Sequence, residues 1–351
     1  MVFLDYASTC PIVKFSSKQH DGFHCNPNAA YAYTERKALM DCEERIKAAI
    51  GVKGGHVLYF RCATEAIDWL YHATVKRADY IWWRRSLYEH DACQFGYEAK
   101  ASHISYATDF YIHQWVNHVT GEIFDLETIR SQLHKTCKLI VDATAGFGKA
   151  KLPSGLDNIA DALFMSGHKI GCPELSFMWL SDTLCEWLGA AKDIRNQWGL
   201  HHGSLSVASV LALTDAVEWA CENGDRVDGH SVRLYAQMND LLDKARIEHY
   251  DVIEHHDVLE PKMFTCSINA IRLNGINADA LQQFLASRGI YVGVGGSACS
   301  AAHDYRVLRA YGLTDDEAAE VIRVSFGDET TSSDIEALVE GIKEYKERFI
   351  V

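Results

Sequence analysis

The stretch KLIVDATAGFGKAKLPSGLDNIADALFMSGHK (138–169) decides the fold of this chain. It holds two short apolar runs, KLIVDA (138–143) and ALFMS (162–166), which are typical of strands buried on both faces of a sheet. The 27 residues from Asp142 to Lys169 (169 − 142) suffice for one crossover between neighbouring parallel strands. Asp142 and Lys169 would then emerge at the same edge of the sheet, where α/β proteins bind their ligands.

The same alternation of apolar runs and helical patterns continues on both sides of this stretch. Helical patterns lie at 64–74 and 125–135, and Asp125 is placed as the N-cap of the second. Strand–helix alternation predicts an α/β fold with a mostly parallel sheet between helices. Further strands are expected at HVLYF (56–60), DYIWW (79–83) and HISYA (103–107).

The pattern changes in the last third of the chain. SLSVASVLALTDAVEWACENG (204–224) predicts a helix that stops at Asn-Gly, and a second helix is expected at 229–247. We therefore expect a large domain at 16–248 and a smaller α+β domain formed by 1–15 and 249–351. The smaller domain is expected to hold strands at 264–273 and 321–327 and helices at 278–288, 314–321 and 333–349.

Composition excludes several classes of protein. The net charge of −14 argues against a general nucleic-acid-binding surface, which needs clustered Lys and Arg. No apolar run approaches the roughly 20 residues of a membrane span, and the start MVFLDYASTCPIV lacks the features of a secretory signal. The 11 cysteines are odd in number, scattered and without a C-x-x-C pair, which indicates reduced thiols in a cytoplasmic protein and no zinc site.

Two residues of the opening stretch have side chains suited to cofactor chemistry. Lys169 directly follows a strand and can form a Schiff base, and Ser166 and His168 beside it can hold a phosphate. Asp142 ends a strand and can hold a protonated pyridine nitrogen. Each also fits a plain alternative, a loop lysine or an aspartate that closes a turn. Their combination at one sheet edge favours the cofactor site.

Two other segments add to this picture. Cys62-Ala63-Thr64-Glu65 opens a helix after a strand, and the backbone N–H groups there can cradle a phosphate, although Thr is also a common N-cap. GGSACSAA (295–302) surrounds Cys299 with small residues. Such flanks are typical of a loop that presents a thiol, with a buried turn cysteine as the alternative.

Together these motifs identify a family resemblance that runs nearly end to end and stays in order. The chain resembles the cysteine desulfurases of the NifS/IscS type, in the class V aminotransferase group of fold type I enzymes that use pyridoxal 5′-phosphate (PLP). The segments that carry the resemblance are FLDYASTCP (3–11), HCNPNAA (24–30), RCATEA (61–66), YEHDAC (88–93), VDATAGFGK (141–149), SGHK (166–169), HHGSLSV (201–207), GGSACSA (295–301) and VLRAYGLTDDEAAEVIRVSFGDETT (307–331).

The resemblance implies a role for each matching residue. Lys169 would be the Schiff-base lysine, Asp142 the partner of the pyridine nitrogen, and His90 the residue that stacks on the ring and assists proton transfer. Cys299 would receive the sulfur as a persulfide, and Arg323 would bind the substrate carboxylate. The phosphate would be held by Thr64, Ser166 and His168 with the helix start at Cys62 and Ala63, and by Ser204 reaching from the second subunit of a homodimer.

The chain also departs from the family pattern. Ala145 stands where the family usually has a Gln that hydrogen-bonds the cofactor's phenolic oxygen, and either Asn117 or His118 could supply a cofactor or substrate contact. HHGS (201–204) lacks the family's arginine, and the segment 170–174 after the lysine is off-pattern. The chain is shortened near 109–115 and after Cys299.

The expected function is conversion of L-cysteine to L-alanine, with the sulfur passed from Cys299 to a protein acceptor for Fe–S cluster assembly or thiolation. Two alternatives stay open. One is other class V chemistry (selenocysteine lysis, β-elimination or transamination), which the change at Ala145 allows. The other is a catalytically silent scaffold. Retention of the GSAC motif favours the desulfurase, because a transaminase needs no accessory thiol.

Overall fold

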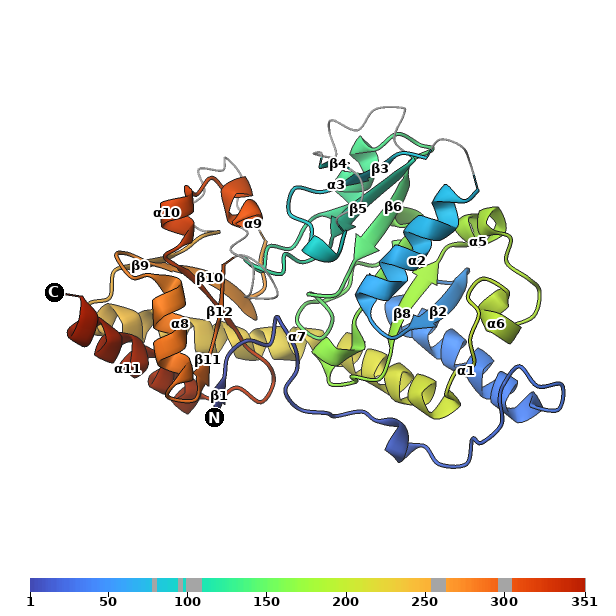
Figure 1. The fold of residues 1–351 in the computed structure, drawn as a ribbon, viewed down its shortest axis with the longest axis horizontal. Helices are drawn as coiled ribbons and strands as arrows, with labels where there is room; N and C mark the ends of the chain where they lie inside the picture. Colours follow the sequence, from blue (N-terminus) through green and yellow to red (C-terminus); the bar gives the residue numbers. More distant parts are fainter. Residues whose placement is uncertain (78–80, 94–96, 99–108, 254–262, 296–304, 351) are drawn as a thin grey trace. The chain divides into compact units, whose positions relative to one another are not determined.

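The computed structural model describes residues 1–77, 81–93, 97–98, 109–253, 263–295 and 305–350 (Figure 1). The chain forms two compact units. The large unit comprises Ile12–Trp115 and Asp125–Asn223, and the small unit comprises Met1–Pro11, Val116–Phe124 and Gly224–Val351. The contacts thus divide the chain at 223/224, whereas the sequence pattern places that boundary at 248/249; the domain division stays a prediction.

The large unit is built on one seven-stranded sheet. All its neighbouring strands pair in parallel except those on either side of β8, which is antiparallel to both of its neighbours. The expected mostly parallel α/β sheet is therefore confirmed. In spatial order the strands are β2 (His56–Phe60), β8 (Ser176–Leu180), β7 (Ala162–Met165), β6 (Lys138–Asp142), β5 (Phe110–Gln114), β3 (Trp83–Arg85) and β4 (Tyr97–Glu98).

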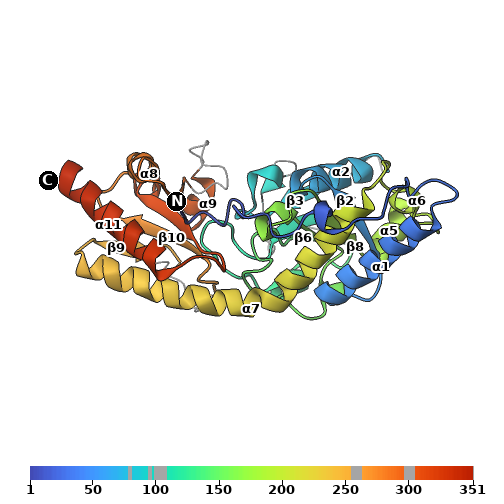
Figure 2. The same ribbon diagram turned by 90° about the horizontal axis from the view of Figure 1, so that it is seen from below.

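Helices cover both faces of this sheet. Figure 2 shows α2 (Ala63–Val75) on one face and α1 (Tyr33–Ile50) with the first part of α7 (Val207–Lys244) on the other. Buried residues of α2 and α5 (Asp182–Leu188) pack with Leu58, Ile140 and Phe164 of the strands. Burying each such side chain contributes about 1.5–3 kcal/mol to folding. Three short helices complete the unit: α3 (Leu126–Gln132), α4 (Leu156–Ile159) and α6 (Arg195–Trp198).

The expected helix stop at Asn223-Gly224 is wrong. α7 runs unbroken from Val207 to Lys244, which Figure 2 shows as one continuous helix, and so it includes the second helix expected at 229–247. The Asn223 side chain does not end the helix, because its Nδ2 donates to the Trp219 carbonyl one turn back, at 2.9 Å. Buried positions continue on both sides of this point, at Ala220 and Val227, so packing outweighs the local stop signal.

The small unit is an α+β layer. Its four-stranded antiparallel sheet has the order β12 (Gly293–Val294), β13 (Val321–Ser325), β10 (Ile268–Leu273) and β9 (His249–Asp251), and β1 (Val2–Phe3) pairs separately with β11 (Ile290–Tyr291). Side chains from α8 (Ala278–Ala286), α11 (Ser332–Phe349) and the second part of α7 share one apolar core with the sheet. Two further helices are α9 (Arg306–Ala310) and α10 (Asp315–Ala318).

The sequence located some elements better than others. The strand at 56–60 and the N-cap at Asp125 are confirmed, the latter by bonds from the Glu127 and Thr128 amides at 3.0 and 3.1 Å. The strand expected at 79–83 instead spans 83–85, and the one expected from 264 begins at Ile268. The strand expected at 103–107 lies outside the described residues. In the parts of the chain that the structure describes, no helix is long and apolar enough to cross a bilayer.

Candidate active site

The carboxyl ends of the parallel strands meet at one edge of the large sheet. β3, β5, β6 and β7 are parallel to one another, and β2 points the same way because both β2 and β7 are antiparallel to β8. Asp142 is the last residue of β6, and the segments that follow β2, β3 and β7 contain Thr64, His90 and Lys169. The prediction that the strands ending near Asp142 and Lys169 are parallel neighbours with their ends at one edge is confirmed, and this is the ligand-binding edge of α/β sheets.

Lys169 lies on a single 3-10 turn between β7 and β8. The turn spans Gly167–Ile170 after Ser166, and the Lys169 amide donates to the Ser166 carbonyl at 3.2 Å. The turn ends at Gly171, whose φ of 82° is in the left-handed region that favours glycine. Lys169 is only 8% exposed. A lysine buried to this extent is a candidate for chemistry.

The surroundings of Lys169 are cationic. Lys149, at the end of the VDATAGFGK motif, is 4% exposed. Burial, followed by the charges of Lys169 and Lys149, lowers the pKa of His168 to about 4. His168 is therefore neutral near pH 7 and can donate one N–H. Two buried lysines beside a neutral imidazole suit a bound phosphate or another anion.

Asp142 ends β6 with its side chain oriented by the backbone that follows. Its Oδ1 accepts the Thr144 amide at 2.8 Å, and the carboxylate is 7% exposed. The Thr144 hydroxyl is buried and has no hydrogen-bond partner among the described residues. Since a buried hydroxyl is rarely left unpaired, this oxygen points to a missing ligand. Sequence reasoning missed Thr144; its position between Asp142 and the unusual Ala145, itself 5% exposed, was the available signal.

His90 lies in a loop after β3 that is held in place by hydrogen bonds. Its Nδ1 accepts the Ala92 amide at 3.0 Å, so the neutral ring carries its proton on Nε2. The His90 amide donates to Oε1 of Glu89 at 3.1 Å, and Glu89 is fully buried. The loop therefore fixes both the orientation and the tautomer of the imidazole, as a residue that stacks on a ring or transfers a proton requires.

The start of α2 meets the segment that precedes α7. Cys62 is the N-cap of α2, with its sulfur accepting the Glu65 amide at 3.4 Å, and Thr64 is exposed in the first turn. The ring of His201 lies 4.7 Å from that of Phe60, at the end of β2. The HHGS segment thus lies near the helix start within one chain, and its Ser204 is exposed.

The small unit holds Arg323 and Asn117. Arg323, on β13, is 3% exposed; its Nη2 donates to Asp5 at 2.7 Å and to Ser8 at 2.8 Å, and its Nη1 donates to the His118 carbonyl at 3.1 Å. The Asn117 Oδ1 accepts the amides of Val119 and Thr120. This fixes the Asn117 amide, whose buried Nδ2 has no partner in the described part of the chain.

The large unit therefore collects most of the expected site residues, namely Cys62, Ala63, Thr64, His90, Asp142, Ala145, Ser166, His168, Lys169 and Ser204. Arg323 and Asn117 belong to the small unit, and Cys299 lies outside the described residues. The donor set of the large unit fits PLP: a buried lysine, a carboxylate at the same sheet edge, a fixed imidazole, a second buried lysine near His168 and an unpaired buried hydroxyl. Among the described residues no cluster of three or more His, Cys, Asp or Glu could hold a metal.

Comparison with known proteins agrees with this geometry. The family model "Aminotransferase class-V" matches residues 90–338. The chain is 24% identical to "Putative cysteine desulfurase NifS" of Halalkalibacterium halodurans, over 99% of both chains. It is 25% identical to "Cysteine desulfurase IscS" of Shewanella pealeana, over 98% of this chain and 92% of that one. A solved "NIFS-LIKE PROTEIN" superposes with a TM-score of 0.81 at 19% identity, covering 99% of each chain, and shares the fold. The chain belongs to the class V aminotransferase family.

Proposed function

We propose that this PLP-dependent chain is a cysteine desulfurase, which converts L-cysteine to L-alanine and transfers the sulfur to Cys299. The observation that carries the proposal is that the buried Lys169 turn and the Asp142 carboxylate both lie at the same edge of the sheet. The relatives named as cysteine desulfurases support the choice of reaction within the family, because they match nearly the whole chain.

Each residue of the large unit would contribute a defined step. Asp142 would hold the ring nitrogen of PLP protonated, and the bound cofactor would then supply an electron sink for carbanion chemistry at the substrate. Lys169 would take the proton from Cα of the substrate. His90, with its proton on Nε2, would donate toward the reacting atoms. Thr64, Ser166 and His168 would hold the phosphate, and the Thr144 hydroxyl would replace part of the donor set lost at Ala145.

Substrate recognition would depend on the small unit. Arg323 is held by Asp5, Ser8 and the His118 carbonyl, and a guanidinium held in this way can bind a carboxylate with defined geometry. Between Asn117 and His118, the fixed Asn117 amide is the better candidate for a further contact, because its Nδ2 is buried and unpaired within the described ranges.

The sulfur transfer balances without an outside oxidant or reductant. The Cβ–S bond of L-cysteine breaks, an S–S bond forms on the Cys299 thiolate, and the carbon that loses sulfur takes up a proton. L-cysteine and one thiol thus become L-alanine and one persulfide. The thiolate is the nucleophile, so Cys299 must be accessible and able to lose its proton near neutral pH.

The proposal extends to partners and location. The exposed Ser204 would reach the phosphate site of a second copy, which makes the active enzyme a homodimer. A protein acceptor would take the persulfide sulfur for Fe–S cluster assembly or thiolation. A cytoplasmic location is supported by the described cysteines, none of which forms a disulfide.

The test is an absorption spectrum of the purified protein with PLP, together with alanine and sulfide assays on L-cysteine. A cofactor band that disappears in Lys169→Ala, with alanine formation that requires Cys299, is the expected result. Alanine formation at the wild-type rate in Cys299→Ala would contradict the sulfur-transfer role. A Lys169-dependent band without sulfur release would favour other class V chemistry, for which the apolar Ala145 is the motivating feature, and no band would favour the scaffold.

A further inference from the structure

The off-pattern segment 170–174 begins at the last residue of the Lys169 turn and has no role in the proposed chemistry. Gly171 ends the turn, and its amide donates back to the Gly167 carbonyl. The Cys172 amide donates to the same carbonyl at 2.9 Å. The geometry of the Lys169 turn therefore depends on where the backbone at 171 and 172 is held.

A segment from the start of the chain holds this backbone. We call residues Lys14–His20 the N-terminal strap. The Lys14 and Phe15 amides both donate to the Gly171 carbonyl, at 2.9 and 3.0 Å. Gly171 also leaves little room beside the strap, because a Cβ there would lie 3.0 Å from the Lys14 side chain. Strap and turn are thus joined directly through the backbone.

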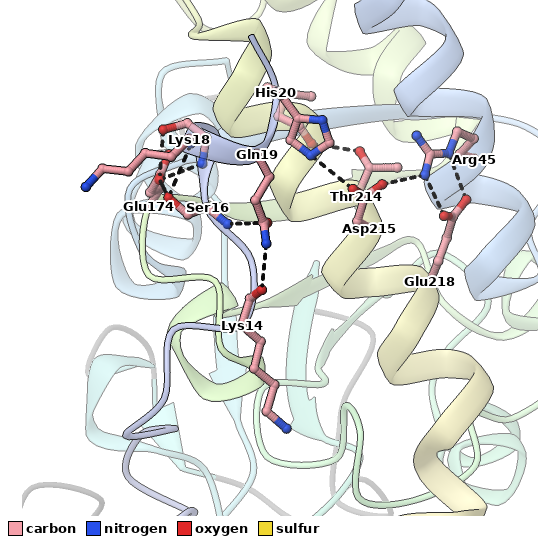
Figure 3. A network of polar contacts seen from close by, with 12 residues as sticks. Lys14, Ser16, Lys18, Gln19, His20, Arg45, Glu174, Thr214, Asp215 and Glu218 are labelled. Carbon is pink, nitrogen blue, oxygen red and sulfur yellow. Dashed lines mark hydrogen bonds and ion pairs between the residues drawn. The ribbon is translucent and has the colours of Figure 1, made fainter.

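Glu174 makes the second connection, shown in Figure 3. Its Oε1 accepts three hydrogen bonds from the strap: the Ser16 hydroxyl at 3.1 Å, the Ser17 amide at 2.8 Å and the Ser17 hydroxyl at 3.0 Å. Its Oε2 accepts the Ser209 hydroxyl, on α7, at 2.6 Å. One carboxylate therefore joins the Lys169 connection, the strap and the start of α7.

The strap is itself preorganised. Ser16 and Gln19 form a capping box, in which the Ser16 amide donates to Gln19 Oε1 at 3.0 Å. The Gln19 side chain also donates to the Lys14 carbonyl at 3.2 Å. At the far end, His20 lies 3.0 Å from Asp215 of α7, which also pairs with Arg45. A segment fixed at both ends can hold the turn without a large loss of entropy.

The charge of Glu174 strengthens these bonds. Burial raises the pKa of Glu174, but the hydrogen bonds from Ser209, Ser17 and Ser16 lower it by more, so the net pKa lies below its usual value. The group is ionised near pH 7, and hydrogen bonds to a carboxylate are roughly twice as strong as neutral ones.

We infer that Glu174 is a positioning residue for Lys169, acting by fixing the strap against the 171–172 backbone that closes the lysine turn. This inference rests on the proposed function, in which Lys169 carries the cofactor and moves the Cα proton. It also accounts for the off-pattern segment: Gly171 and Glu174 are the two residues of 170–174 that bind the strap.

The experiment compares three variants. Glu174→Ala removes all four acceptor contacts, and Glu174→Gln keeps an oxygen for the strap donors. Asp215→Asn is the matched control, because it perturbs the far end of the same network without touching Glu174. Each protein is measured without cofactor by hydrogen exchange at the Gly171 and Cys172 amides, and with PLP by kcat and KM for L-cysteine.

The expected result is specific to Glu174→Ala. Its 171 and 172 amides exchange at least about tenfold faster, and its kcat falls about tenfold while KM changes less than about twofold. Glu174→Gln restores most of both quantities. Asp215→Asn lowers the melting temperature but leaves the amide exchange rates and kcat near their wild-type values.

Two results overturn the inference, and they are distinguishable from failure of the proposed function. Unchanged exchange and kcat in Glu174→Ala would show that the strap does not position the turn. Equal effects in Glu174→Ala and Asp215→Asn would show a general loss of stability. A wild-type protein with no Lys169-dependent cofactor band would refute the proposed function itself, and the inference with it.

Discussion

Removal of the Asp5 carboxylate is the sharpest test of how the small unit holds Arg323. Asp5 and Arg323 are 16% and 3% exposed in their side chains and lie 2.7 Å apart. Asp5→Ala leaves the guanidinium its bonds to Ser8 and to the His118 carbonyl, and removes its negative partner. A buried charge that loses its partner is destabilising, because water cannot fully replace the lost contact.

The magnitude follows from the contacts that remain. Loss of one partner from a wholly buried ion pair costs about 3–5 kcal/mol, and a single hydrogen bond to a charged group contributes about 1.5–3 kcal/mol. Because two acceptors stay in place and the Asp5 position is partly exposed, we expect a loss of about 2 kcal/mol. With a urea m-value of about 2 kcal/mol/M, the unfolding midpoint should fall by about 1 M.

Two probes make the assay informative. All eight tryptophans belong to the large unit, so tryptophan fluorescence follows that unit while circular dichroism follows both. Asp5→Ala should lower the midpoint by circular dichroism, and Asp5→Asn, which keeps one acceptor oxygen, should lower it by about half as much. In the active enzyme the KM for L-cysteine should rise about tenfold in Asp5→Ala, because the guanidinium is no longer held in place. Unchanged midpoints by both probes would refute the reasoning.

Three further outcomes are expected. Gly293→Ala places a Cβ 2.9 Å from the Arg323 guanidinium and should raise the KM for L-cysteine about tenfold in steady-state assays. Gly229→Ala is its control: this exposed α7 position has nothing within 4 Å of the added Cβ, so urea unfolding should show a gain of about 0.5–1 kcal/mol and KM should not change. The pKa of Glu174 in the folded state lies below its ordinary value of 4.5. Its ionised carboxylate therefore contributes to the free energy of unfolding at pH values above 4.5, and this contribution is lost as the pH falls through the folded-state pKa. The stability difference between wild type and Glu174→Gln should therefore shrink in urea titrations as the pH is lowered below about 4.5; a difference that grows in acid would contradict the assigned sign.

The strands that form the site edge could be predicted because their signal is local. KLIVDA and ALFMS are short, apolar and bounded by polar residues, and the structure places them as β6 and β7. The helix stop at Asn223-Gly224 could not be judged in the same way, since the outcome depends on packing at Ala220 and Val227, which continue the buried face of α7. The antiparallel direction of β8 was also not readable, because strand direction is set by the connection before it and not by the strand's own residues.

The residues of the candidate site also differ in whether their signal in the sequence is local. Lys169 and Asp142 could be proposed from their places beside predicted strand ends, and His90 from the family resemblance. Thr144 and Glu174 could not, since their significance lies in partners that only the folded chain brings together: an unpaired buried hydroxyl in one case and donors from 16, 17 and 209 in the other. The contact between Arg323 and Asp5 joins residues 318 positions apart and is invisible to any local pattern.

The antiparallel direction of β8 restricts how the sequence of this chain can evolve. Residues 166–175 join two adjacent strands of the sheet directly, with Lys169 among them and β7 and β8 paired along their length. Because this connection joins two adjacent antiparallel strands, the distance between its two ends is fixed. An inserted residue would have to bulge outward or displace Lys169. Length variation should therefore collect in the other connections of the large unit, while 166–175 changes by substitution alone.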